Sequence, residues 1–186
     1  MGRQSVLCPG VLLDRDGTII VDHGYVGSVE MVDLIDGAAE AIARLNRAGV
    51  PVAVVTNQAG VARGFYDIRD VEEVHLYIAD LLALHGAHID AFFYCPYHPE
   101  GTVAEFAHPS VDRKPRPGMA RAAAEALNLD LTSSWVVGDR AEDIGLAKAV
   151  GAAAIYVGPD ASVCPGVWSC PNLFLATDII LEGIAV

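Results

Sequence analysis

Short apolar runs alternate with helix-forming stretches along most of this chain. The runs with the composition of buried strands lie at residues 11–13, 52–55, 91–95, 135–137 and 152–157. Between them, the spacing of apolar residues predicts helices at residues 37–48, 67–85, 118–127 and 141–150. Strands that alternate with helices are typical of a doubly wound parallel sheet. We therefore expect an α/β fold whose active-site loops lie at the carboxyl ends of the strands.

The length of the chain and the gaps between its motifs predict one domain. A chain of 186 residues is the size of one domain, so we expect residues 1–186 to form a single unit. About 40 residues separate Asp16 from Thr56, fewer than the ~50 of a separate domain. The stretch from Thr56 to Lys114 must supply a helix, a strand and a long proline-containing loop. We therefore expect no separate cap domain, and specificity that depends on short loops.

Two carboxylates stand two positions apart directly after the first apolar run, in Asp14-Arg15-Asp16-Gly17-Thr18. Residues i and i+2 of an extended chain face the same side, so Asp14 and Asp16 can converge on one small electrophile. One carboxylate can attack while its neighbour handles a proton, as covalent phosphoryl transfer requires. Alone, the same residues are also typical of a plain Asp-Gly turn.

Three further polar groups follow in order. Thr56-Asn57-Gln58 ends the second strand run and could bind phosphate oxygens, or simply form a turn. Arg113-Lys114 precedes Pro115 in a loop that is either a cation site or a solvated basic segment. Asp139 ends the run at residues 135–137, with Asp143 one helical turn later; Asp139 could bind a metal or cap the following helix.

In this order, the acid pair, threonine, lysine and acid resemble the haloacid-dehalogenase-like (HAD) phosphatase superfamily. Longer strings resemble the D-glycero-D-manno-heptose-1,7-bisphosphate 7-phosphatase family. They are Asp22-His23-Gly24-Tyr25-Val26, residues 56–64, Cys95-Pro96-Tyr97-His98-Pro99 and the Arg-Lys-Pro-x-Pro-Gly-Met string from Arg113. The similarity extends from about Leu12 to Val157.

The resemblance implies roles for particular residues. Asp14 would be the nucleophile that forms an aspartyl-phosphate, and Asp16 the acid and base, with catalysis assisted by Thr56, Arg113 and Lys114. Mg²⁺ would be held by Asp14, the backbone carbonyl of Asp16, and Asp139, since that ion prefers oxygen ligands. The implied substrate-binding residues are Asp22, His23, Gly24, Tyr25, Thr56, Asn57, Gln58, Ala59, Arg113, Lys114 and Arg140.

The chain departs from the family pattern in two places. Arg140 stands where the family commonly has lysine, which keeps the charge and changes the hydrogen-bond geometry. Related enzymes often carry a structural zinc site, Cys-x-His…Cys-x-Cys, but the matching positions here are Cys95, Tyr97, Ser110 and Asp112. Only one of these four is a good zinc ligand. We expect no zinc; a shifted set of Cys95, His98, His108 and Asp112 is the alternative.

Composition limits the partners and the location. The net charge of −12 argues against nonspecific nucleic-acid binding. No run reaches the roughly 18 apolar residues of a membrane span, and the first ten residues lack a signal-peptide core. The four cysteines follow no disulfide-framework spacing, and Cys164 and Cys170 are expected, reduced, in a terminal loop. We expect a cytoplasmic monomer that acts on a small sugar phosphate.

Three classes of function remain open from the sequence. The first is a phosphatase that removes the C7 phosphate of a heptose bisphosphate during nucleotide-activated heptose synthesis. The second is a phosphatase for another small ester, such as histidinol phosphate or another sugar bisphosphate. The third is a non-catalytic module that binds sugar phosphates. The sequence does not determine which anomer is used, which nucleotide is attached downstream, or the oligomeric state.

Overall fold

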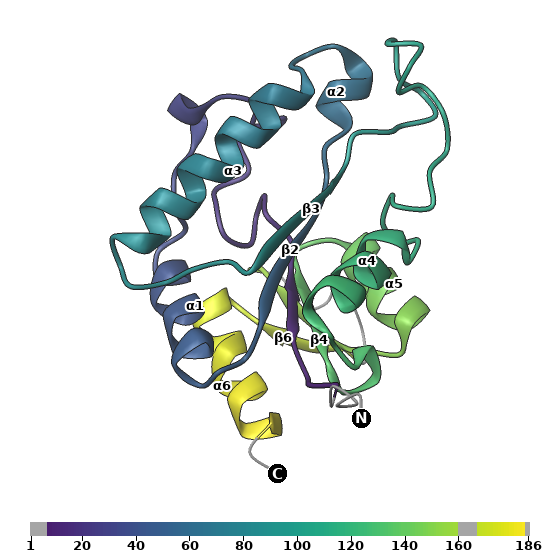
Figure 1. Cartoon of the computed structure of the whole chain (residues 1–186). Helices are drawn as coiled ribbons and strands as arrows, with labels where there is room; N and C mark the ends of the chain where they lie inside the picture. Colours follow the sequence, from purple (N-terminus) through teal and green to yellow (C-terminus); the bar gives the residue numbers. More distant parts are fainter. Residues whose placement is uncertain (1–6, 160–166, 185–186) are drawn as a thin grey trace, which may run out of the picture.

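The computed structural model describes residues 7–159 and 167–184, and its centre is one parallel sheet (Figure 1). The sheet has six strands in the order β3-β2-β1-β4-β5-β6. The strands are β1 (Val11–Leu13), β2 (Val52–Asn57), β3 (Ala91–Cys95), β4 (Trp135–Gly138), β5 (Ala153–Val157) and β6 (Trp168–Cys170). Every pairing between them is parallel. The predicted α/β class with a doubly wound sheet is confirmed.

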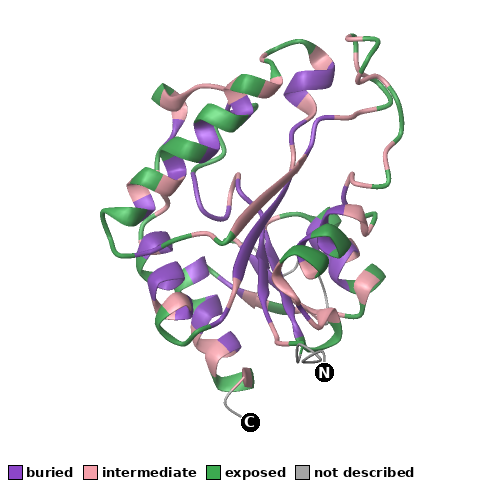
Figure 2. Ribbon diagram, in the orientation of Figure 1, coloured by how far each residue is buried: buried purple, intermediate pink, exposed green. Residues whose placement is uncertain are grey.

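Helices cover both faces of the sheet. They are α1 (Ala38–Arg47), α2 (Ala59–Arg63), α3 (Ile68–Ala83), α4 (Gly118–Leu127), α5 (Ala141–Val150) and α6 (Leu173–Ile184), with 3-10 turns at Val29–Met31 and Leu131–Ser133. Apolar residues of α1, α3 and α6 pack in one buried cluster, and those of α4 and α5 in a second. Figure 2 shows the buried strands between helices whose outer faces are exposed. In the described residues no helix is both long and apolar enough to cross a bilayer.

The central strands divide their side chains between these two clusters. Val11 and Leu13 belong to the cluster that contains α1, while Leu12 between them belongs to the cluster that contains α4. This alternation follows from the two-residue period of a strand. Helices cover both faces of the sheet, so successive side chains of a central strand are all buried. This explains why the central strands appear in the sequence as continuous apolar runs.

The strand order reverses beside β1. The chain moves from β1 outward to β2 and β3, then returns to the other side of β1 for β4, β5 and β6. Leu13 pairs with Val54 on one side and Val137 on the other. This register places Asp14, the next residue, between the ends of β2 and β4. Ligand sites of open α/β sheets lie at such a reversal.

The predicted elements are confirmed to within about two residues at each end, and two α-helices and one strand were not predicted, nor were the two 3-10 turns. The unpredicted helices are α2 and α6, and the unpredicted strand is β6. Cys170, expected in a terminal loop, is instead the buried last residue of β6. Cys164 lies outside the described residues. After β1 the described chain forms a 3-10 turn and α1, and after β2 it forms α2 and α3, so neither gap contains a cap domain.

Candidate active site

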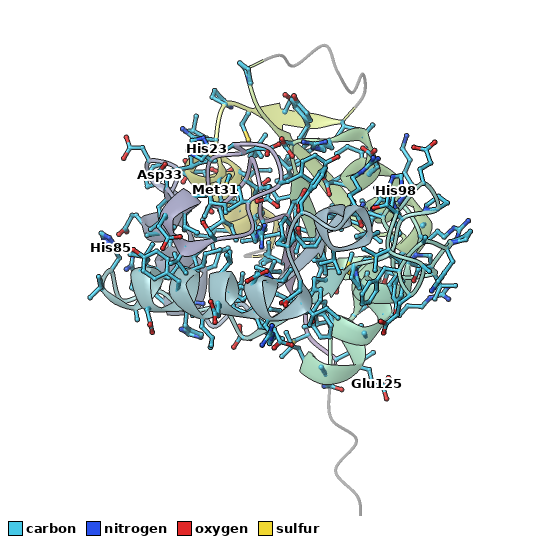
Figure 3. The ribbon with its side chains drawn as sticks, turned by 90° about the horizontal axis from the view of Figure 1, so that it is seen from above. His23, Met31, Asp33, His85, His98 and Glu125 are labelled. Carbon is cyan, nitrogen blue, oxygen red and sulfur yellow. The ribbon has the colours of Figure 1, made fainter. Side chains whose placement is uncertain are left out.

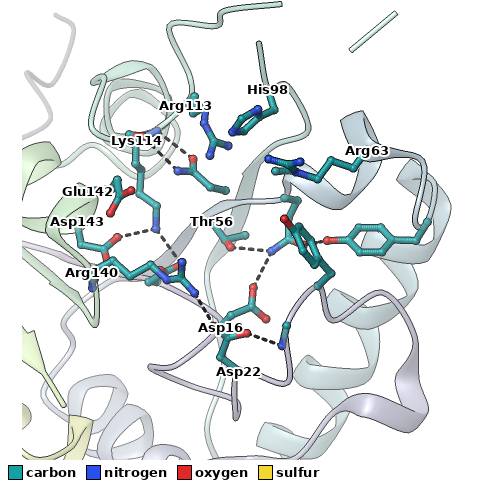
Figure 4. A pocket seen from close by; sticks show the side chains of 17 residues that line it. Asp16, Asp22, Thr56, Arg63, His98, Arg113, Lys114, Arg140, Glu142 and Asp143 are labelled. Carbon is teal, nitrogen blue, oxygen red and sulfur yellow. Dashed lines mark hydrogen bonds and ion pairs between the residues drawn. The ribbon is translucent and has the colours of Figure 1, made fainter. Parts of the chain in front are cut away.

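A pocket of about 260 Å³ opens at the carboxyl ends of the strands (Figure 4). Its walls come from the carboxyl end of β2 and from the segments that follow β1, β2, β3 and β4, which include the first turns of α2 and α5. The predicted residues that line it are Asp14, Asp16, Asp22, Gly24, Tyr25, Thr56, Asn57, Gln58, Ala59, Arg113, Lys114 and Arg140. Arg63, Tyr66, His98, Glu142 and Asp143 also line it and were not predicted as site residues. The structure thus brings together residues from the segments that follow four different strands.

Lys114 is buried between two carboxylates. Its Nζ lies 2.8 Å from Oδ1 of Asp14 and 2.6 Å from Oδ1 of Asp143. Burial alone would lower the pKa of Lys114, but the two carboxylates outweigh it and raise that pKa, so the ammonium stays charged. A fixed positive charge therefore stands beside the carboxylate at the end of β1.

Asn57 holds the backbone of Lys114 in place. Its amide nitrogen donates to the carbonyl oxygen of Lys114 over 3.2 Å, and its Oδ1 accepts from the backbone N–H of Lys114 over 3.0 Å. The Lys114–Pro115 peptide bond is cis. A residue expected only to contact substrate is thus also the anchor of the lysine loop.

Three carboxylates form the acidic centre of the site. One oxygen each from Asp14, Asp139 and Asp143 lies within 4.8 Å of the others. Burial, followed by the charge of Asp14, raises the pKa of Asp139 to about 6 and that of Asp143 to about 7. Oδ1 of Asp139 has no hydrogen-bond partner among the described residues. The nearest cation to this oxygen in the described part of the chain is Nε of Arg140, at 4.0 Å. Crowded carboxylates with an oxygen that accepts no hydrogen bond fit a divalent cation such as Mg²⁺, which takes oxygen ligands.

The sequence identified Asp139 and missed Asp143 as a member of this centre. The N-cap position of α5 is Arg140, and Oδ2 of Asp143 accepts from the Arg140 backbone N–H over 3.0 Å. The alternative in which Asp139 caps this helix is therefore wrong. Asp139 does not line the pocket surface; its carboxylate lies against Gly17. The φ of Gly17 is +79°, and a Cβ added to this residue would collide with the Asp139 carboxylate.

Asp16 is held away from Lys114 by a separate network. Nη2 of Arg15 donates to Oδ1 of Asp16 over 3.0 Å, and the amide of Gln58 donates to its Oδ2 over 2.8 Å. The Gln58 amide also donates to Oγ1 of Thr56 over 2.9 Å, while Oε1 of Gln58 accepts from Tyr66 over 2.7 Å. Burial raises the pKa of Asp16 against the opposing charge of Arg15, which favours a carboxyl group that carries a proton.

The loop after Asp16 forms another wall of the pocket. Asp22 accepts from the guanidinium of Arg140 over 2.6 Å and from the backbone N–H of Gly24 over 2.8 Å. His23 does not line the pocket; its ring lies 2.9 Å from Oδ2 of Asp33 and is exposed. Figure 3 shows His23 and Asp33 together on the side of the molecule opposite His98. Arg140 therefore reaches the pocket already paired with a carboxylate.

The loop that follows β3 is packed through its own side chains. The Tyr97 ring lies 4.5 Å from the His108 ring and 5.8 Å from the Phe106 ring, centroid to centroid. Cys95 is buried, and burial raises the pKa of its thiol. In the part of the chain that the structure describes, Asp14, Asp139 and Asp143 form the one cluster of three metal-ligand residues. The side chains of the alternative zinc set, Cys95, His98, His108 and Asp112, do not form a cluster of metal ligands in the described residues.

Known proteins match this chain in sequence and in structure. A family model described as HAD-hydrolase-like matches residues 111–162. A protein of Escherichia coli O6:H1 named D-glycero-beta-D-manno-heptose-1,7-bisphosphate 7-phosphatase is 39% identical over 177 residues, which cover 95% of this chain and 90% of that one.

Two solved structures share the fold closely. A HAD-like phosphatase from Mesorhizobium loti has a TM-score of 0.86 at 36% identity, covering 96% of this chain and 86% of that one. The D,D-heptose 1,7-bisphosphate phosphatase from B. bronchiseptica, solved with magnesium and phosphate, has a TM-score of 0.82 at 31% identity. That comparison covers 94% of this chain and 98% of the other.

Proposed function

The chain belongs to the heptose-1,7-bisphosphate 7-phosphatase family of HAD-like hydrolases, and we propose that it removes the C7 phosphate of D-glycero-D-manno-heptose 1,7-bisphosphate. The observation that carries the proposal is the buried contact of Asp14 with Lys114 in a pocket that also holds Asp16 and Thr56. The relatives are named for the β anomer, so the β anomer is the first substrate to test.

In the proposed reaction a carboxylate oxygen of Asp14 attacks phosphorus and the bond to the sugar oxygen breaks. The leaving oxygen takes the proton of Asp16, and the phosphoryl group is left on Asp14 as an acyl phosphate. Asp16 then accepts a proton from the water that hydrolyses this aspartyl-phosphate, which returns both residues to their starting state. The bonds from Arg15 and Gln58 keep the Asp16 carboxyl oriented between these two proton transfers.

The anionic phosphoryl group needs compensating charge. The ammonium of Lys114 lies beside Asp14, so it would neutralise the group in transfer, and Thr56 would donate a hydrogen bond to it. Asp14, Asp139 and Asp143, with the backbone carbonyl of Asp16, would hold Mg²⁺. The bound ion would supply positive charge that offsets repulsion between the attacking carboxylate and the phosphate. The arrangement of the three carboxylates supports this assignment.

We also propose that the enzyme acts as a monomer without zinc. The loop at residues 96–112, which would carry the zinc ligands, is packed by Tyr97, Phe106 and His108. Elemental analysis of purified enzyme checks the zinc proposal. Zinc present at one equivalent per chain after exchange into metal-free buffer would contradict it.

A phosphate-release screen tests the proposed substrate. It compares both anomers of the heptose bisphosphate with fructose 1,6-bisphosphate and histidinol phosphate, each with Mg²⁺ and with EDTA. We expect the largest kcat/KM for a heptose bisphosphate and loss of release in EDTA. A larger kcat/KM for histidinol phosphate or for fructose bisphosphate would assign the enzyme to another substrate.

Replacement of the nucleophile is the sharpest test of the mechanism. Asp14→Asn keeps the shape of the side chain but replaces the attacking carboxylate with a neutral amide, so turnover should fall by at least about a thousandfold. Rapid-quench experiments with labelled substrate should trap a phosphorylated protein in the wild type and none in the variant. Full Mg²⁺-dependent turnover by Asp14→Asn would show that another residue attacks.

A further inference from the structure

The side-chain amide of Gln58 is a hydrogen-bonding centre in the wall of the pocket, and the residue is 1% exposed. Its nitrogen donates to Asp16 and to Thr56, and these two bonds are drawn in Figure 4. Its oxygen accepts from Nη2 of Arg15 over 3.0 Å and from the hydroxyl of Tyr66 over 2.7 Å. Both N–H groups and both oxygen lone pairs of this amide are therefore in use.

The orientation of the Gln58 amide decides what its two acceptors can do. Rotation by 180° would turn the amide oxygen toward the Asp16 carboxylate and the N–H groups toward the Arg15 guanidinium, and both contacts are repulsive. In the observed orientation Oγ1 of Thr56 accepts from the amide, so the hydroxyl hydrogen of Thr56 points elsewhere. Thr56 lines the pocket, where this hydrogen can reach a phosphoryl oxygen. A twist of the amide would therefore disturb the phosphate donor and the proposed acid together.

The ring of Tyr66 fits between two glycines. A Cβ added to Gly27, in the segment after β1, would collide with the ring, and one added to Gly60, in α2, would collide with the end of the ring that carries the hydroxyl. The backbone on either side is also fixed: the N–H of Phe65 donates to the carbonyl of Gly60 over 2.9 Å, and Asp67 is the N-cap of α3. The slot and the surrounding backbone therefore hold the hydroxyl at its hydrogen bond to the amide.

Tyr66 acts as a donor because its hydroxyl keeps its proton. Burial raises the pKa of Tyr66 to about 12, although the charge of Arg15 and the backbone N–H of Gly60 act in the opposite direction. In the described part of the chain Tyr66 gives no hydrogen bond to Asp16 or to Thr56. It can therefore orient these two residues only through the amide between them.

We infer that Tyr66 is a positioning residue for phosphoryl transfer, whose hydroxyl holds the Gln58 amide in the orientation that serves Asp16 and Thr56. The inference rests on the proposed function, because that reaction gives Asp16 and Thr56 their parts. Tyr66 takes no part in the chemical step itself. No motif in the sequence pointed to Tyr66, since its role depends on the slot between two glycines that lie far apart along the chain.

A double-mutant cycle tests whether Tyr66 acts through Gln58. For the heptose bisphosphate, kcat and KM are measured in the wild type, Tyr66→Phe, Gln58→Met and the double variant. Tyr66→Phe keeps the ring in its slot and removes only the hydroxyl, so kcat should fall by about threefold to tenfold with KM unchanged. In the Gln58→Met background the amide is gone, so the addition of Tyr66→Phe should change kcat no further. Tyr77→Phe, at an exposed position on α3, is the matched control and should behave as the wild type.

Three results would overturn this role of Tyr66. They are a wild-type kcat in Tyr66→Phe, an equal fall in kcat in both backgrounds, and a raised KM with kcat unchanged, which would mean that the hydroxyl contacts substrate directly. If Gln58→Met does not fold, Tyr66→Phe still decides, because a lower kcat at a wild-type KM and Tm supports the inference and a wild-type kcat overturns it. A wild-type enzyme that prefers another phosphate ester contradicts the proposed substrate, and the same cycle with that ester then tests Tyr66.

Discussion

Arg15 occupies the middle position of Asp14-Arg15-Asp16, and its side chain is completely buried. Its guanidinium donates to Asp16, to Oε1 of Gln58 over 3.0 Å and to the carbonyl oxygen of Val26 over 2.9 Å. It therefore ties the proposed acid to the end of β2 and to the loop that forms another wall of the pocket. In a strand the side chain of the middle residue faces away from its two neighbours, so the sequence pattern concealed this role.

Removal of the Arg15 guanidinium should damage proton transfer to the leaving group more than the attack on phosphorus. With a sugar phosphate, whose leaving oxygen needs a proton, Arg15→Met should lower kcat by about a hundredfold or more. With p-nitrophenyl phosphate, whose leaving group departs without a proton, the loss should be much smaller. Equal losses on both substrates would indicate a general structural defect. Thermal denaturation of Arg15→Met and of the control Arg121→Gln, which removes an exposed cation from α4, shows whether the fold is kept.

At the scale of elements, α3 contains a buried histidine that the sequence did not distinguish from the exposed ones. His75 is 6% exposed, its ring lies 4.7 Å from the Phe92 ring, centroid to centroid, and its Nε2 has no hydrogen-bond partner among the described residues. Burial, followed by the charge of Arg15, lowers the pKa of His75 to about 3. The packing of α3 on β3 thus depends on a neutral imidazole.

This buried ring predicts a contribution that destabilises the fold in acid. The unfolded chain binds the proton near pH 6.5 and the folded chain only near pH 3, so His75 costs no stability above pH 6.5 and lowers stability progressively as the pH falls. Between pH 6.5 and 5 the loss should be about 2 kcal/mol. Asp139 and Asp143, whose pKa values are raised in the folded state, contribute the opposite pH dependence, so the quantity to compare is the difference from the wild type. In urea denaturation His75→Leu should gain about 2 kcal/mol relative to the wild type between pH 6.5 and 5, while His85→Gln, at an exposed position just after α3, should keep the wild-type pH dependence. An unchanged slope in His75→Leu would mean that the ring is protonated when buried.

The elements that the sequence did not predict are short or lack a clear period. α2 has five residues and β6 has three, which is too few for a hydrophobic period to appear. Residues 173–184 of α6 are so apolar that no single stripe stands out. Asp14, Thr56 and Asp139 could be predicted as neighbours because they lie at the carboxyl ends of strands, which meet at one edge of a parallel sheet. His98 and Arg63 could not, since they reach the same pocket only because Thr102 and Val103 dock on α2.

At the scale of the whole molecule, the chain has an excess of negative charge, and negative charge is also concentrated at the candidate active site. The net charge is −12, and three carboxylates are crowded at the site with Lys114 as the buried cation that contacts two of them. The raised pKa values of Asp139 and Asp143 show that the folded chain does not favour these charges without further compensation. A cation that binds here would relieve this repulsion in the folded state alone.

Mg²⁺ should therefore stabilise the fold as well as support turnover. At a concentration about a hundred times the Kd, binding to the folded state adds about 2.7 kcal/mol, which for a chain of this size raises Tm by about 5 to 11 °C. Asp139→Asn should abolish most of that rise, because it removes one of the three carboxylates at the centre of the sheet's carboxyl edge. Glu125→Gln removes an exposed acid from α4 and should retain the rise, which controls for nonspecific screening of the net charge. If Tm in Mg²⁺ equals Tm in EDTA while phosphate release still requires the ion, the cation enters with the substrate and the three carboxylates do not bind it in the free enzyme.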